Sequence, residues 1–162
     1  MDQNSFKTGL CIGDLDTFEW PVDVKVPTNG DYTTHRFTGQ FRYISLDETK
    51  DLLAGVETPD IDPADPRASL LLAEHTAQIQ VDLYMQIWRG WGDDLTGPED
   101  KPLPVNDQAK RQLLSQRIIR EAVIEAYRQS QGGEEARLGN SETLPDSGQQ
   151  EDAATTESTS TS

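Results

Sequence analysis

Cysteine and histidine are scarce in this chain, and their scarcity excludes several kinds of site. A single cysteine, Cys11, cannot form an internal disulfide, and a chain without disulfides suits a reducing compartment. The two histidines, His35 and His75, lie far from each other and from Cys11, without the spacing of a metal site or a catalytic dyad. Neither a G-x-x-x-x-G-K-[ST] nor a G-x-G-x-x-G motif occurs. We therefore expect no enzymatic activity, no metal and no cofactor.

Basic residues are also few compared with acidic ones. The chain has 14 basic residues against 29 acidic ones, a net charge of −15. Nucleic acid and anionic membrane surfaces would repel such a chain, so we expect neither as a partner. No apolar run is long enough to cross a bilayer, and the first residues lack the basic start and apolar block of a signal peptide. We expect an intracellular protein.

Apolar residues are few, at 34 %, and the deficit is concentrated after Ser130. Residues 132–162 contain no aromatic and no β-branched aliphatic residue, and seven acidic residues stand there against Arg137 alone. Such a segment buries too little apolar surface to offset the entropy lost on ordering. We therefore predict one folded domain over residues 1–131 and a disordered acidic tail over 132–162.

Residues 18–43 have the period-2 alternation of half-buried strands. Trp20, Val22 and Val24 fall on one side, with charged residues between them. The Asn29–Gly30 pair separates this run from a second one, and Asn-Gly between alternating runs is a strong hairpin signal. The pattern predicts a β-hairpin whose apolar face packs on other elements.

Helical periodicity follows in three segments, at about 46–54, 67–89 and 107–130. Ser45 and Glu48 match a capping box, and Asn106 matches the N-cap of the last helix. The second segment carries a broad apolar stripe that includes Leu71 and Leu72. These elements predict an α+β fold, in which an N-terminal β-hairpin packs on a small bundle of about three helices.

Seven aromatic residues are the candidate core or partner-binding positions: Trp20, Phe37, Phe41, Tyr84, Trp88, Trp91 and Tyr127. Trp88 and Trp91 fit one face of a helix end at i and i+3, where they would fill the seam between the two long helices. Alternatively, at least one of them stays partly exposed and anchors a partner. We favour the core interpretation, because large aromatic side chains are usually buried.

The order of several short motifs over residues 18–130 resembles that of the tail assembly chaperones of long-tailed bacteriophages and prophages. The first half has W-P-V-D-V-K-V-P, N-G-D and F-T-G-Q-F-R-Y-I-S, beginning at Trp20. The second half has W-R-G-W-G-D-D-L, P-L-P-V-N and L-L-S-Q-R-I-I-R-E-A-V-I-E-A-Y, beginning at Trp88. The connection V-E-T-P-D-I-D-P-A-D-P-R-A-S between the halves departs from the pattern.

The resemblance implies a protein of the host cytoplasm that is not part of the mature virion. It would bind the phage tape measure protein, keep the helices of that protein soluble and help to recruit the tail tube protein. Members of this family often have a longer form made by ribosomal frameshift, which, with a homo-oligomer, stays open as a further partner. Two alternatives are an acidic DNA mimic that inhibits a DNA-binding protein and a minor structural protein of the tail.

Overall fold

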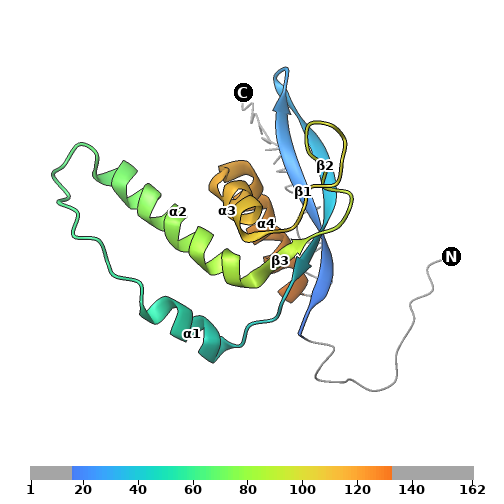
Figure 1. Cartoon of the computed structure of the whole chain (residues 1–162). Helices are drawn as coiled ribbons and strands as arrows, with labels where there is room; N and C mark the ends of the chain where they lie inside the picture. Colours follow the sequence, from blue (N-terminus) through green and yellow to red (C-terminus); the bar gives the residue numbers. More distant parts are fainter. Residues whose placement is uncertain (1–15, 133–162) are drawn as a thin grey trace, which may run out of the picture. The chain divides into compact units, whose positions relative to one another are not determined.

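The structure, a computed structural model, describes residues 16–132 and has an α+β fold, as predicted. Its elements are β1 (Phe18–Thr28), β2 (Asp31–Phe41), α1 (Leu46–Ala54), α2 (Ala68–Ile87), β3 (Trp88–Trp91), α3 (Asp107–Ser115) and α4 (Arg117–Gln131) (Figure 1). The chain forms two separate units, Met1–Gln131 and Gly132–Ser162. Cys11 and the predicted tail beyond Gly132 lie outside the described residues.

The predicted hairpin is present and forms two strands of an antiparallel sheet with the order β1-β2-β3. Asn29 and Gly30 have φ angles of 49° and 88°, the left-handed conformation that a two-residue type I′ turn requires at both positions. The turn sets Thr28 opposite Asp31, and this register continues to Phe18 opposite Phe41.

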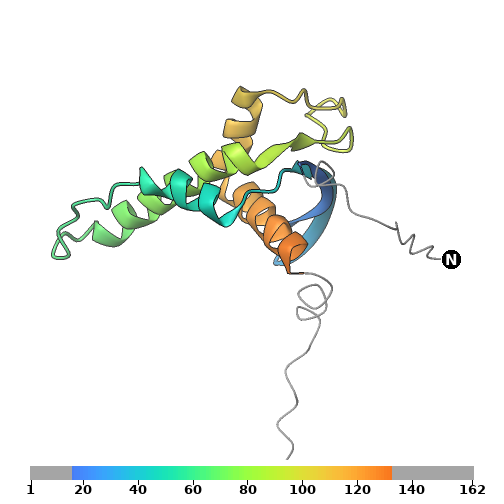
Figure 2. The same cartoon turned by 90° about the horizontal axis from the view of Figure 1, so that it is seen from below.

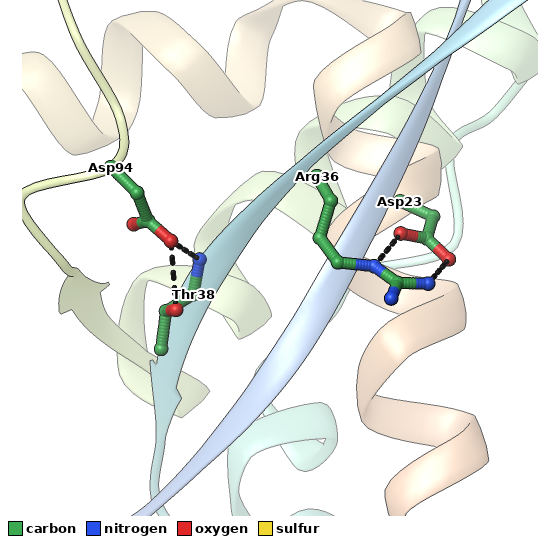
Figure 3. A network of polar contacts seen from close by, with 4 residues as sticks. All are labelled: Asp23, Arg36, Thr38 and Asp94. Carbon is green, nitrogen blue, oxygen red and sulfur yellow. Dashed lines mark hydrogen bonds and ion pairs between the residues drawn. The ribbon is translucent and has the colours of Figure 1, made fainter.

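This register places the apolar residues of both strands on one face of the sheet. Val22, Val24, Phe37 and Phe41 are buried there, as the alternation predicted. The other face is polar: Asp23 and Arg36 lie directly opposite and form a bidentate ion pair, with N–O distances of 2.6 and 2.8 Å (Figure 3). The Arg36 guanidinium holds the pKa of Asp23 below its ordinary value.

The third strand, β3, corrects the prediction that a helix extends to residue 89. The helix α2 ends at Ile87, and Trp88–Trp91 pairs with the end of β2. Phe41 lies opposite Trp88 and Gln40 opposite Gly90, so Arg89 is an extra residue in a β-bulge. The bulge places Trp88 and Trp91 on the same face of the sheet, although they are three residues apart. The same spacing fits a helix, which is why the periodicity was ambiguous.

The predicted helix at 107–130 is two helices, α3 and α4, separated at Gln116. The Arg120 side chain holds this corner together. It is buried and donates hydrogen bonds to the carbonyl oxygens of Leu114 and Ser115 at 3.0 and 3.3 Å, and to Gln80 on α2 at 3.2 Å. A cation at the end of α3 satisfies carbonyl groups that would otherwise have no helical partner.

The caps of the other helices are largely as predicted. Ser45 accepts a hydrogen bond from the backbone N–H of Glu48, and Asn106 accepts one from Ala109. The predicted return bond of the capping box is wrong, because the carboxylate of Glu48 instead pairs with Arg42 at 2.6 Å. Arg42 also donates to the carbonyl oxygen of Gln86, and so connects the end of the sheet to both α1 and α2.

Candidate functional site

The aromatic candidates lie in the core and not on a free surface. Phe37, Phe41, Tyr84, Trp88 and Trp91 are buried, whereas Trp20 and Tyr127 are half-buried against the same core. The ring centroids of Trp88 and Trp91 are 5.1 Å apart. Those of Tyr84 and Tyr127 are 6.1 Å apart, with the two rings edge to face. With exposed fractions of 0 % and 3 %, Trp88 and Trp91 are core residues, and the interpretation of one as an exposed anchor is wrong.

Trp91 also fixes the loop that follows β3. Its indole N–H donates a hydrogen bond of 2.8 Å to the carbonyl oxygen of Leu103, and the backbone N–H of Leu103 donates to Leu95. On the other face of the strand, Val105 packs against Gly90 so closely that a Cβ there would be 2.7 Å from a Val105 methyl group. Trp91 therefore precedes this loop because it holds the loop on the sheet.

A carboxylate makes a second attachment of the same loop to the sheet. Asp94 accepts hydrogen bonds from the backbone N–H and the hydroxyl of Thr38, both at 2.8 Å (Figure 3). Partial desolvation acts to raise the pKa of Asp94, but the two bonds from Thr38, together with a hydrogen bond from its own backbone N–H, lower the pKa below its ordinary value. This carboxylate is consequently charged at neutral pH and has a structural role.

Most of the exposed aliphatic residues of the described range lie elsewhere, in residues 45–80, which we call the arm. The arm comprises α1, the following connection and the first part of α2, and it extends away from the sheet in both views (Figures 1 and 2). It contains nine leucine, isoleucine and valine residues, and none of its residues is buried. The most exposed are Leu46 at 72 %, Leu70 at 58 % and Leu72 at 55 %.

A groove runs between α1 and α2 and continues along α2 beyond the arm to Gln86. Its volume of about 360 Å³ lies in the range of ligand-binding pockets. Its apolar lining is Leu52, Leu53 and Val56 on the side of α1 and Ile79 and Leu83 on α2, with His75, Gln78, Asp82 and Gln86 as polar neighbours. Leu53 and Val56 are 41 % and 38 % exposed. A groove between two helices that is lined in part by aliphatic side chains can receive an apolar side chain of a partner.

The arm also carries most of the negative charge of the described residues. It has eight acidic and two basic residues, a net charge of −6, whereas the rest of residues 16–132 has twelve acidic and ten basic residues. An exposed apolar surface therefore coincides with a strongly acidic one. This combination distinguishes the arm from the nearly neutral sheet and helices that form the core.

The described residues offer little reactive chemistry. Within residues 16–132 no group of histidine, cysteine and acidic side chains could hold a metal ion, and no helix is both long and apolar enough for a bilayer. The only large pKa shift in this range belongs to Tyr84, whose pKa burial raises to about 12. The chain matches no family model and no curated protein, and no solved structure resembles it.

The helical periodicity does not reveal the exposed arm, because it places Leu71 and Leu72 on a buried stripe. Leu72, which the stripe included, is mostly exposed, and Leu71 is only half-buried. One signal was available. Three consecutive leucines, Leu70–Leu72, cover about 200° of a helix at 100° per residue, so they cannot all face one core.

Proposed function

We propose that this protein is a tail assembly chaperone of a long-tailed bacteriophage and that the arm is its client-binding surface. In this role it binds helical segments of the tape measure protein, keeps them soluble in the host cytoplasm and helps to recruit the tail tube protein. The role is one of binding and not of catalysis. The chaperone leaves before the virion is mature.

One observation carries the proposal: of the nine large aliphatic residues in the arm, five are exposed and the other four are only half-buried. Exposed apolar residues that are concentrated in one part of a protein often mark a protein-interaction site. Amphipathic client helices bind grooves of this kind through their apolar face. The ordered motifs over residues 18–130 support the same function, since they resemble those of the chaperone family.

The distribution of charge argues against a DNA mimic. A mimic presents carboxylates in place of phosphates on a rigid face, whereas the acidic arm of this protein alternates carboxylates with exposed leucines. Outside the arm, the described part of the chain is nearly balanced in charge. A partner of the arm therefore needs an apolar surface and not only a basic one.

Co-expression with the tape measure protein of the same phage tests the proposal. We expect the soluble fraction of the tape measure protein to rise in the presence of this protein and the two to copurify. The double substitution Leu70→Ser with Leu72→Ser should abolish this effect, since it removes apolar surface without altering charge. Tyr32→Ser, at the exposed tip of the hairpin, is the matched control and should solubilise the client like the original protein.

Two results would count against the proposal. A tape measure protein that is equally insoluble with and without this partner would refute the chaperone function. Recovery of this protein from purified virions would favour the structural protein of the tail instead.

A further inference from the structure

The arm that holds the groove is acidic, and three of its carboxylates are unpaired within residues 16–132. Asp51 adjoins Leu52 of the lining, Glu57 follows Val56, and Glu74 precedes His75. All three side chains are exposed, and none makes an ion pair or a side-chain hydrogen bond with any residue between 16 and 132. Asp82 differs, because Arg111 already pairs with it at 3.1 Å. The free carboxylates are thus available to a partner.

The negative charge of the arm indicates which kind of partner the groove would bind. A second copy of the protein would bring another arm with a net charge of −6 against the first. The segment 133–162 of the same chain has seven acidic residues and one basic residue, so it is repelled in the same way. Like charges brought together across an interface are unfavourable, whereas opposite charges speed and select association. The favoured occupant is basic.

We infer that the groove between α1 and α2 binds an amphipathic helix whose apolar stripe is flanked by lysine or arginine. The inference rests on the proposed function and deepens it, because it specifies which client segments the arm selects. Apolar side chains of the client enter the groove between Leu53 and Ile79, and its basic residues face the acidic side chains of the arm. Burial of apolar side chains provides most of the affinity, and charge complementarity determines which helices are preferred.

The test uses two synthetic amphipathic helices labelled with fluorescein, with leucine at the i, i+3, i+4 and i+7 positions. One carries lysine on its polar face and the other glutamate. Binding to the full chain is measured by fluorescence anisotropy at low and at high salt. We expect the lysine helix to bind at least about tenfold more tightly than the glutamate helix at low salt, and the difference to shrink as salt is added.

Two triple variants with equal loss of charge separate the arm from the protein's overall charge. Asp51→Asn, Glu57→Gln and Glu74→Gln neutralise the arm, and Glu19→Gln, Asp93→Asn and Asp100→Asn neutralise three acids elsewhere. We expect the arm variant to bind the lysine helix about tenfold more weakly and the control less than about twofold more weakly. Leu53→Ser with Val56→Ser, which leaves the charge unchanged, should also weaken binding. The unfolding midpoint of each variant shows whether the fold is retained.

Either of the following outcomes would refute the inference. Equal affinity for the two helices, or equal weakening by the two triple variants, would show that the arm does not select basic partners. A dimer that Leu53→Ser with Val56→Ser dissociates would show that a second copy fills the groove. Failure here is distinguishable from failure of the chaperone function, because the tape measure protein can remain soluble through the arm without any preference for basic helices.

Discussion

At the scale of the residue, the two buried tryptophans differ in one hydrogen bond. The indole N–H of Trp91 donates to Leu103, whereas that of Trp88 is buried and has no partner among residues 16–132. Both rings belong to the same cluster and lose the same atoms when replaced by phenylalanine. The pair of substitutions therefore isolates the contribution of the bond that holds the loop.

We expect Trp91→Phe to destabilise the fold by about 1 kcal/mol more than Trp88→Phe, because it leaves a carbonyl group without its donor. Trp88→Phe also removes a buried N–H that is unsatisfied, which offsets part of its packing loss. Urea unfolding of the two variants measures the difference. An equal loss of stability, or a larger loss for Trp88→Phe, would contradict the role of Trp91 in holding the loop.

The ionisation of Tyr84 should make the free energy of unfolding depend on pH in the alkaline range. Its pKa is about 12 in the folded protein, raised first by burial and then by Tyr127, against about 10 in an unfolded chain. A group whose pKa is raised on folding contributes stability that is fully present below pH 10 and is lost as pH rises toward 12. The loss over this window should be about 2 kcal/mol.

We expect Tyr84→Phe to remove this alkaline loss, since phenylalanine has no proton to release. The free energy of unfolding, measured between pH 8 and the alkaline limit, should fall less steeply for the variant than for the original protein. Tyr32→Phe, on the exposed hairpin tip, serves as the control. An unchanged alkaline slope in Tyr84→Phe would mean that Tyr84 is ionised as easily in the folded protein as in water.

At the scale of the element, buried cations stabilise the ends of helices. Lys110 is buried and donates to the carbonyl oxygen of Met85 near the end of α2, at 3.0 Å. Arg120 does the same for α3 and creates the corner between α3 and α4. Positive charge at a helix C-terminus interacts favourably with the helix dipole and with unpaired carbonyl groups.

We expect Arg120→Met to cost about 2–3 kcal/mol, because it leaves the carbonyl groups of Leu114 and Ser115 without a donor in a buried place. Arg117→Met, on the same helix, is the matched control. The exposed Arg117 pairs with Glu121 at the surface, where solvent screens the ion pair, so its loss should cost much less stability than the loss of Arg120. Chemical denaturation of both variants gives the comparison, and similar losses would refute the capping role of Arg120.

The elements differ in how readily the sequence revealed them. The hairpin was predictable because alternation and an Asn-Gly turn act locally. The short strand β3 was not, since only its pairing with Phe41 and the bulge at Arg89 distinguish it from a helix end. The break at Gln116 has no glycine or proline to mark it, and depends on the distant contact of Arg120 with Gln80. The strand β3 and the break at Gln116 were therefore not predictable from local sequence, because both depend on tertiary contacts.

The site was harder to predict than the fold, for the same reason. The seven aromatic candidates are core residues that support the sheet, and the sequence correctly favoured burial for Trp88 and Trp91. The run Leu70–Leu72 shows that at least one leucine of the arm faces away from a core, but which leucines are exposed depends on their neighbours in space. Periodicity indicates which residues share a face, but it cannot indicate whether another element covers that face.

At the scale of the whole molecule, the described residues combine a buried core with an arm that contributes nothing to it. The core lies between the sheet and the helices α2 and α4, and every fully buried aliphatic residue belongs to it. The arm has no buried residue and is connected to the core largely through α2 and Arg42. Regions with few buried contacts open at low free energy.

We expect amide hydrogens of α1 to exchange at least about tenfold faster than those of α4 in the free protein, because the arm opens without unfolding the core. Hydrogen exchange followed by mass spectrometry resolves the two helices. Equal protection of α1 and α4 would show that the arm is as firmly packed as the core.

The most direct test of the arm as the client-binding surface compares amide exchange in the free protein with exchange in its complex with the tape measure protein. We predict that binding slows exchange in residues 45–80 and leaves the strands β1 and β2 unchanged. Slowed exchange confined to the hairpin, with residues 45–80 exchanging as in the free protein, would contradict the assignment.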